Sequence, residues 1–242
     1  MIRRYYLKSA LFCFTATLAT LPYSISQEAK SGADGKTVQN NEVVVKDADK
    51  DNKDAEKKAK WIPLIERDSL KGWEITNFGG EGSVEVNDGV TRFGNGDPLT
   101  GITITRKDFP KENFELRWKA MRVDGTDFFA GVTFPVDDQH CSFIAGGWGG
   151  GLVGLSSING SDASENETSG FHQFKSKQWY SFRVRVDKKH ITAWIDEKEI
   201  LKVEREKGKF GLRAEVLKSR PLGYCVFQSI VDLKEWEYQL LD

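Results

Sequence analysis

Strict alternation of apolar and polar residues is the feature that most limits the possible folds. The run NFELRWKAMRV (residues 113–123) places Phe, Leu, Trp and Ala at one parity and Glu, Arg and Lys at the other. Residues 179–203 repeat this pattern in three segments separated by the turns DKKH and DEKE, at hairpin spacing. Because a strand directs successive side chains to opposite faces, each segment predicts a strand with one buried and one solvated face.

The continuous apolar run FFAGVTF (residues 128–134) differs from these segments. It predicts a strand buried on both faces, and we expect it to pair with the strand over residues 113–123.

Turn signals divide the rest of the chain into further short strands. Asn87-Asp88-Gly89 between two β-prone runs predicts a hairpin. Further strands are expected at residues 73–76, 83–86, 90–93, 101–105, 210–214, 224–229 and 236–240. No segment has the apolar spacing of a long amphipathic helix, and no internal repeat is evident. The pattern therefore predicts an all-β sandwich or barrel.

The first 60 residues are expected to precede this domain. Residues 1–26 have a basic start, an apolar core over residues 9–21 and small residues near the end, as in a secretory signal peptide. The apolar core is shorter than the about 20 residues of a membrane span, although an uncleaved anchor is the alternative. Residues 27–60, rich in Lys, Asp, Asn, Ala and Gly, predict a solvated linker. The folded domain is expected over residues 61–242, in a secreted or periplasmic protein.

Charge and cysteine content limit the expected partners and covalent links. The formal net charge of -1 offers no basic surplus for nucleic acid or an anionic membrane, so neither is expected as a partner beyond the signal peptide. After signal removal, Cys141 and Cys225 are left. They are either two buried free thiols or a disulfide, and their separation in sequence does not decide between these.

A glycine-rich stretch around Trp148 is the main candidate for a binding site. Residues 146–154 contain six glycines, and a run rich in Ser, Asn, Asp and Glu follows to residue 168. An exposed indole beside hydroxyl, amide and carboxylate groups suits a carbohydrate. We expect Trp148 to stack on a sugar, and Asp162, Glu165 and Asn166 to bind its hydroxyls or a metal. The alternative is a glycine-rich strand leading to a surface loop, with Trp148 filling a hole in the core.

Several acids are candidates for chemistry, because glycoside cleavage usually needs two carboxylates flanking the bond. The candidates for proton transfer are Glu165, Asp127, Glu215 and His140, with Arg213 as a further substrate-binding residue. Each acid has the alternative role of a solvated loop charge or turn former. Arg213, Glu215 and Arg220 equally fit a structural ion-pair network.

The order of these motifs resembles the 3-keto-disaccharide hydrolase family. The segment WIPLIERDSLKGWEI (residues 61–75), the two strands NFELRWKAMRV and FFAGVTF, the segment over residues 178–200 and the closing strand carry the resemblance, which covers residues 61–241. It implies a concanavalin A-like jelly roll of two antiparallel sheets, one with a concave face, and hydrolysis of 3-keto sugars. It also implies a divalent metal in some members.

The chemistry that this resemblance implies is elimination followed by hydration. A 3-keto group acidifies the proton on C2, so cleavage needs a base and an electrophile near the ketone more than a strong acid. The chain departs from the family at residues 140–151. There it reads HCSFIAGGWGGG, whereas many members have polar and acidic residues on that strand.

Three functions follow from these observations. The first is an exported hydrolase of 3-keto disaccharides or glycosides. The second is a non-catalytic carbohydrate-binding module, which acids pointing apart would favour. The third is a cell-envelope interaction protein, which a buried Trp148 and an apolar concave face would favour.

Overall fold

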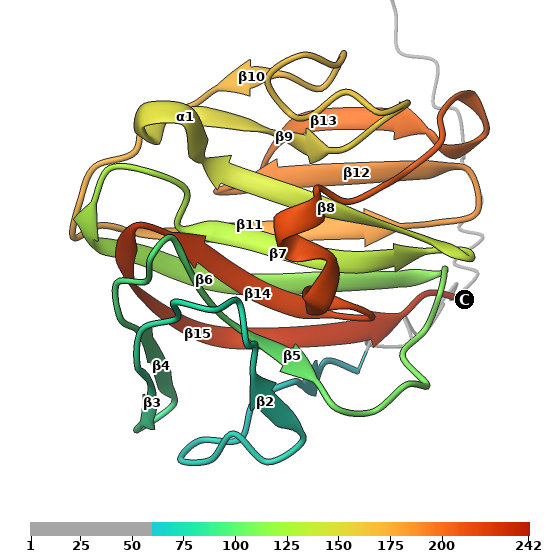
Figure 1. The fold of residues 1–242 in the computed structure, drawn as a ribbon. Coiled ribbons are helices and arrows are strands. Elements are labelled where there is room, and N and C mark those ends of the chain that lie inside the picture. Colours follow the sequence, from blue (N-terminus) through green and yellow to red (C-terminus); the bar gives the residue numbers. More distant parts are fainter. Residues whose placement is uncertain (1–59) are drawn as a thin grey trace, which may run out of the picture. The chain divides into compact units, whose positions relative to one another are not determined.

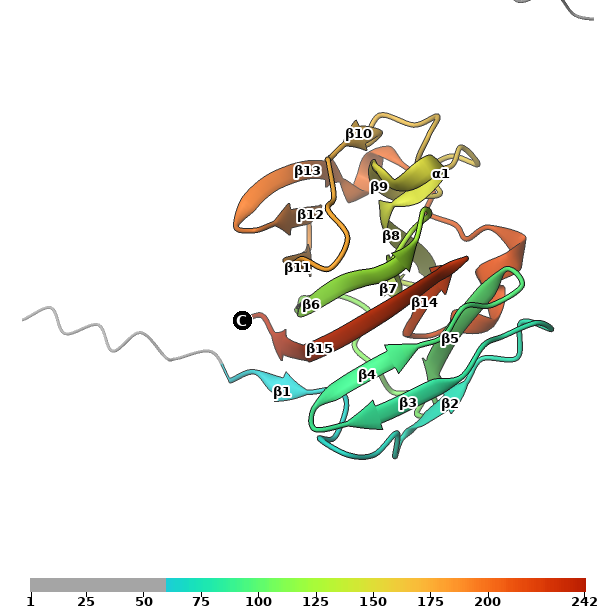
Figure 2. The same cartoon turned by 90° about the vertical axis from the view of Figure 1, so that its left-hand side faces the viewer.

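The structure is a computed structural model that describes residues 60–242. The expected signal peptide and all but the last residue of the expected linker lie outside these residues. Within them, two antiparallel sheets pack face to face as a jelly-roll sandwich, which confirms the all-β prediction (Figures 1 and 2). No helix in this part of the chain has the length and apolarity needed to cross a membrane.

One sheet, here called the β6 sheet, contains the longest strands. Its members are β1 (Ile62–Pro63), β3 (Val84–Asn87), β4 (Val90–Phe93), β6 (Phe114–Gly125), β11 (Trp179–Val186), β12 (His190–Ile195), β13 (Lys198–Glu204) and β15 (Ser229–Leu240). They run in the order β13-β12-β11-β6-β15-β4-β3, with β1 paired to β15.

The other sheet, here called the β8 sheet, carries the glycine-rich stretch. Its members are β2 (Trp73–Ile75), β5 (Leu99–Ile104), β7 (Ala130–Val136), β8 (Gln139–Gly146), β9 (Leu152–Ser156), β10 (Gly170–Phe171) and β14 (Gly223–Phe227). They run in the order β10-β9-β8-β7-β14-β5-β2. The helical elements are short: α1 (Gly147–Gly150), η1 (Arg205–Lys207) and η2 (Ala214–Ser219).

The core lies between the sheets and follows the predicted parity. Phe114, Leu116 and Trp118 of β6 are buried, and the Trp118 ring stacks on Phe182 of β11 with 5.5 Å between centroids. Burial of such side chains contributes roughly 1.5–3 kcal/mol each. The opposite parity of β6 carries Arg117 and neighbouring charged residues on the outer face. The alternation in the sequence therefore defined the two faces of this sheet correctly.

The strands depart from the predictions in three places, once in partner and twice in extent. β7 is buried along its whole length as expected, but it pairs with β8 and β14 and not with β6. A strand buried on both faces needs cover on each, and the middle of the β8 sheet supplies it. Residues 210–214 form no strand. Phe210 makes a single bridge to Ile158, and the chain then enters η2 at Ala214. The predicted strand over residues 236–240 is the end of the longer β15.

Local geometry agrees with the turn signal and decides between the two alternatives for the cysteines. Asp88 and Gly89, between β3 and β4, both have positive φ (51° and 77°). A two-residue hairpin turn of type I′ requires this, and it explains the glycine. Cys141 and Cys225 are both free and buried, and burial raises the pKa of each thiol to about 12.

Candidate functional site

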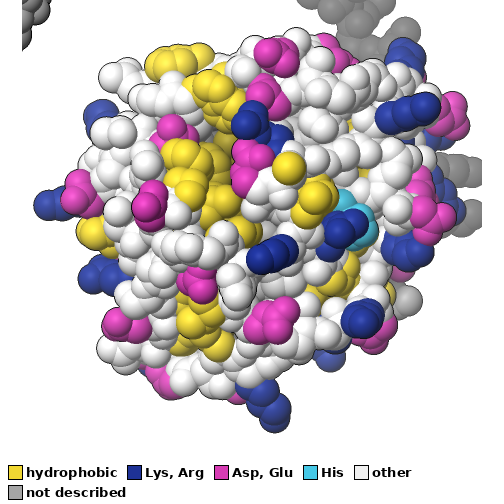
Figure 3. Space-filling model, viewed as in Figure 1, with side chains coloured by type: hydrophobic (Ala, Val, Ile, Leu, Met, Phe, Trp, Pro, Cys, Tyr) yellow, Lys and Arg dark blue, Asp and Glu magenta, His cyan; other side chains and the backbone are white. Residues whose placement is uncertain are grey.

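A cavity opens on the outer face of the β8 sheet, beside η2. Figure 1 shows the short orange-red helical segment of η2 crossing in front of the strands of this sheet. Its volume is about 220 Å³. The lining side chains come from three parts of the chain: residues 127–156, residues 213–216 and the end of β14. Figure 3 shows this face, with apolar side chains gathered in a hollow and charged groups beside them. Four of the predicted site residues line the cavity: Asp127, Trp148, Arg213 and Glu215.

Trp148 is placed by the glycine cluster. The chain turns sharply at α1, where Trp148 has φ 47° and ψ 58° and Gly149 has φ 86°. The left-handed conformation is costly for a residue with a Cβ but not for glycine, so the flanking glycines absorb most of the turn. The Trp148 side chain is 46% exposed. It therefore does not fill a hole in the core but presents its ring at the edge of the cavity.

Arg213 links the polar groups at this edge. Its Nη1 donates to Asp162 Oδ2 at 2.6 Å and its Nε donates to Glu215 Oε1 at 2.5 Å. Its guanidinium carbon lies 5.7 Å from the centroid of the Trp148 ring. Of the alternative ion-pair network of Arg213, Glu215 and Arg220, the pair between Arg213 and Glu215 is present, whereas Arg220 forms no ion pair among residues 60–242. Arg213 also brings Asp162 next to the cavity.

These contacts shift the pKa values of two groups. The hydrogen bond to Glu215 raises the pKa of Arg213 despite partial burial. Partial burial alone would raise the pKa of Asp162, but the hydrogen bonds from Ser164 and the interaction with Arg213 outweigh it and lower the pKa. Both groups therefore stay charged around neutral pH, and Arg213 is fixed between two carboxylates.

Asp127 is held differently. It lies in the loop from β6 to β7, and its Oδ1 accepts a hydrogen bond from the Phe128 amide at 2.7 Å. Within residues 60–242 it takes part in no ion pair. Asp127 is thus a fixed carboxylate at the cavity that forms no direct ion pair among the described residues. The Arg122 guanidinium, which donates to the Asp127 carbonyl oxygen at 3.4 Å, is close enough to interact with its charge.

The other predicted residues lie outside the cavity. Asn166 uses its amide within its own loop, donating to the carbonyl oxygens of Leu155 (2.7 Å) and Asp162 (2.7 Å) and accepting from Thr168. Glu165 is exposed in the same loop. His140 is half-buried on β8, and its pKa is lowered by burial and by Arg220 and Lys111. The structure does not bring these three residues together with Asp127.

Six lining residues were not among the predicted ones. They are Phe128, Ser142, Ile144, Ser156, Val216 and Phe227. The parity of residues 139–146 indicates that Ser142 and Ile144 share one face of β8. No local signal marks Val216 or Phe227, because they reach the cavity only through the tertiary fold.

The described residues do not fit a divalent metal ion. Between residues 60 and 242, no group of three or more His, Cys, Asp or Glu side chains is arranged to hold one. Asp162 and Glu215 are both already paired with the Arg213 guanidinium. Oxygen-rich sites with free carboxylates are what Mg²⁺ and Ca²⁺ require.

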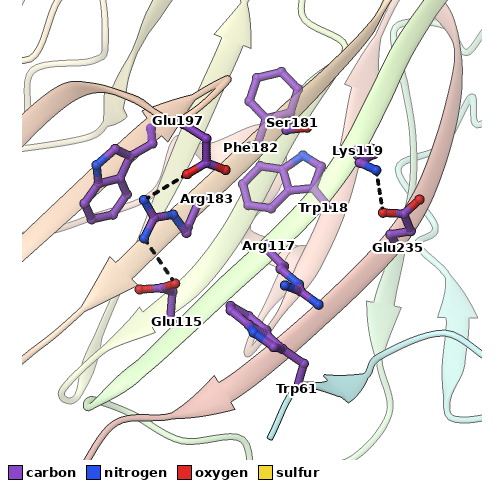
Figure 4. A pocket seen from close by; sticks show the side chains of 11 residues that line it. Trp61, Glu115, Arg117, Trp118, Lys119, Ser181, Phe182, Arg183, Glu197 and Glu235 are labelled. Atoms are coloured by element: carbon purple, nitrogen blue, oxygen red, sulfur yellow. Dashed lines mark hydrogen bonds and ion pairs between the residues drawn. The ribbon is translucent and has the colours of Figure 1, made fainter. Parts of the chain in front are cut away.

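A second hollow, here called the β6-sheet groove, lies on the outer face of the other sheet (Figure 4). Its volume is about 400 Å³. Two arginines cover two indoles there: Arg117 lies 4.0 Å from the Trp61 ring centroid and Arg183 lies 4.0 Å from that of Trp194. Lys119 pairs with Glu235 at 2.7 Å. Trp118 and Phe182 also line the groove, but both are buried and their rings stack in the core.

Comparisons with known proteins agree with this architecture. The family model described as "3-keto-alpha-glucoside-1,2-lyase-like domain" matches residues 60–234. A β-glucanase from Bacillus licheniformis is 9% identical with a TM-score of 0.51, over 76% of this chain and 98% of that chain. The apo form of Crh5 transglycosylase is 13% identical with a TM-score of 0.50, over 76% and 84%. These two likenesses establish a shared fold.

A carbohydrate-binding module, CBM66 from Bacillus subtilis, also matches. It is 10% identical with a TM-score of 0.47, over 73% of this chain and 99% of that chain. No curated protein sequence matches the chain significantly.

Proposed function

The chain belongs to the 3-keto-alpha-glucoside-1,2-lyase-like domain family, and from this membership we propose that it cleaves the glycosidic bond of 3-keto glucosides. The reaction is assigned to the cavity beside Trp148. One observation carries the proposal: this cavity combines a half-exposed indole, a guanidinium and a carboxylate free of ion pairs among the described residues. The indole suits the C–H face of a sugar, and the two charged groups suit acid–base chemistry at a ketone.

Asp127 is assigned as the base. It removes the proton from C2, which the ketone at C3 acidifies, and negative charge develops on the C3 oxygen. The C1=C2 double bond forms as the C1–O bond breaks, and the departing oxygen takes a proton from water. Addition of water across the double bond then completes the hydrolysis, and Asp127 returns its proton to the solvent.

Arg213 is assigned as the group that stabilises the developing oxyanion. A fixed cation in a partly dry site costs no reorganisation at the moment of reaction. Asp162 and Glu215 hold the guanidinium in place through the contacts of 2.6 and 2.5 Å. Glu215 is thereby a positioning residue for Arg213, and Trp148 is a platform for the sugar ring.

The second candidate is a non-catalytic carbohydrate-binding module. The placement of Glu165 outside the cavity favours it, as does the pairing of both Asp162 and Glu215 with the same arginine. Only Asp127 is then left as a free carboxylate at the cavity. In this alternative, Trp148 and Arg213 bind sugar and no bond breaks.

Export is the third element of the proposal. The basic start and apolar core of residues 1–26 support a signal peptide and a secreted or periplasmic location. Amino-terminal sequencing of protein recovered from fractionated cells tests it. A mature chain beginning near Gln27 outside the cytoplasm supports export, and an intact Met1 in the cytoplasm contradicts it.

The activity is tested by following products with NMR. The full chain is incubated with a 3-keto disaccharide and with its unoxidised parent, each with and without a chelator. Turnover of the keto sugar alone, insensitive to chelator, is the expected result. Turnover of both sugars would indicate an ordinary glycosidase, and chelator sensitivity would show a cation site that the described acids do not reveal. Line broadening without product would favour the binding module. The absence of both line broadening and product would overturn the carbohydrate assignment.

A further inference from the structure

The cavity beside Trp148 has two chemically different parts. Its charged groups are Asp127, Arg213 and Glu215. Apart from Ser142 and Ser156, the rest of the wall is apolar. Ile144 and Val216 are at most 5% exposed and pack in one cluster with Phe128, whose ring centroid lies 5.7 Å from that of Phe227. A polyhydroxylated sugar ring in contact with this wall would leave its hydroxyls without partners, at a cost in free energy. The apolar part therefore suits a different portion of a substrate.

The size of the cavity supports the same division. Its volume of about 220 Å³ is below the roughly 300–1,000 Å³ of pockets that enclose a whole drug-sized ligand. It is nevertheless larger than an apolar cavity of about 150 Å³ that accepts benzene. The space thus fits one aromatic ring and not two sugar rings.

Ser156 supplies the second observation. This residue of β9 lines the cavity, is 2% exposed, and its Oγ has no hydrogen-bond partner. Its neighbour across the strand pair, Ser142, also lines the cavity, but the Oγ of Ser142 lies 2.8 Å from Thr133 Oγ. A buried hydroxyl without a partner is unfavourable unless a ligand or water completes it. Ser156 therefore marks a place for one oxygen atom at an otherwise apolar wall.

We propose that this cavity is the aglycone subsite and that it selects glucosides whose aglycone is an aromatic ring carrying a hydroxyl. The ring occupies the space between Phe128, Ile144 and Val216, and its hydroxyl bonds to Ser156 Oγ. The sugar then lies toward Trp148 and Arg213. This inference rests on the proposed function, since it assigns the sugar and the aglycone to different parts of the same site.

Binding of unoxidised glucosides tests the inference without requiring turnover. Phenyl α-D-glucoside is compared with methyl α-D-glucoside by NMR titration of the full chain. The phenyl compound is expected to bind about tenfold more tightly, because its ring leaves water for the apolar wall. The cavity-filling variant Val216→Phe is expected to reduce its affinity to that of the methyl compound. Equal affinities in the unmodified protein would overturn the proposal.

The role of Ser156 is tested with the 2-, 3- and 4-hydroxyphenyl α-D-glucosides. At least one isomer is expected to bind more tightly than the phenyl compound. Ser156→Ala should weaken the binding of that isomer by about 3- to 10-fold. Ser219→Ala is the matched control, because the Ser219 Oγ is also buried and without a partner but does not line the cavity. Both variants should be at least as stable as the parent.

The outcomes separate this inference from the proposed function. If no glucoside binds and no keto sugar is cleaved, the proposed function fails. If phenyl and methyl glucosides bind equally and Ser156→Ala changes nothing, the aglycone subsite is overturned while the carbohydrate function stands. Equal losses in Ser156→Ala and Ser219→Ala would assign the effect to stability and would likewise overturn it.

Discussion

The cavity on the β8 sheet and the β6-sheet groove use the same residue types, tryptophan, arginine and glutamate, but pair them differently. In the groove, Arg117 and Arg183 each cover an indole at 4.0 Å, and Arg117 also contacts Glu237 at 2.5 Å. In the cavity, one arginine serves two acids, and the Trp148 ring lies farther away, at 5.7 Å, and is 46% exposed. In the larger hollow, the arginines and the indole rings thus already contact one another.

This difference shows why volume alone does not identify a site. The groove holds about 400 Å³ against about 220 Å³ for the cavity. Ligand binding in the groove would first have to break contacts between cations, acids and rings. The cavity instead offers the Ser156 hydroxyl, which has no hydrogen-bond partner, and the Asp127 carboxylate, which accepts from the Phe128 amide but forms no ion pair among the described residues. A ligand therefore gains interactions there without breaking an ion pair.

Asp127→Asn is the sharpest test of the comparison. The amide oxygen of Asn still accepts from the Phe128 amide, but the base is lost, so kcat with a 3-keto glucoside should fall by a factor on the order of 10³. Asp124→Asn is the matched control, since Asp124 Oδ1 accepts from the Gly125 amide at 2.8 Å in the same way but does not line the cavity. Retained activity in Asp127→Asn would remove Asp127 from the mechanism.

Arg213→Met should have the next largest effect. It removes the cation assigned to the C3 oxyanion and leaves Asp162 and Glu215 without their shared partner, so kcat should fall by about 10². The corresponding change in the groove, Arg117→Met, should alter kcat by less than about twofold, since it breaks only an exposed ion pair and a ring contact. Comparable losses in the two variants, measured at equal folded fraction, would contradict the assignment of chemistry to the β8 sheet.

Trp148→Gly separates binding from stability. Glycine relieves the left-handed conformation at φ 47°, so the free energy of unfolding should stay constant or rise by about 1 kcal/mol. Loss of the ring should weaken sugar binding by about tenfold. Trp194→Ala in the groove should show the reverse: a lower free energy of unfolding and unchanged sugar affinity. Chemical denaturation and NMR titration measure the two quantities, and destabilisation by Trp148→Gly would show that the indole is structural.

The smallest expected effect concerns pH. Burial, Arg220 and Lys111 lower the pKa of His140 below its usual 6.5. The neutral imidazole is therefore favoured on folding, and stability present above pH 6.5 is lost as pH falls through the lowered pKa. His140→Gln should flatten the dependence of the free energy of unfolding on pH between about 5 and 7. An unchanged pH dependence would contradict the shift, and a large loss of turnover at constant stability would return His140 to the catalytic candidates.

The sequence predicted which residues lie near the site better than it predicted which groups those residues contact. The glycine cluster marked the turn at Trp148, and the pairing of Arg213 with Glu215 was one of its open alternatives. Asn166 has the right chemistry for a sugar, but its amide closes its own loop, because nearby carbonyl oxygens lie within reach at 2.7 Å. Val216 and Phe227 gave no signal at all. An apolar residue in a short polar segment looks the same whether it lines a cavity or packs under a loop.

The sequence by itself determined which residues face the core, because alternation along a strand fixes the face of every side chain once one face is buried. It also determined the turn at Asp88-Gly89. Only the tertiary structure decided that β7 joins the β8 sheet and that Arg213 meets Asp162, 51 residues earlier in the chain. These contacts depend on which strands become neighbours in space. That choice depends on burial and hydrogen bonding across the whole sandwich, and no local pattern encodes it.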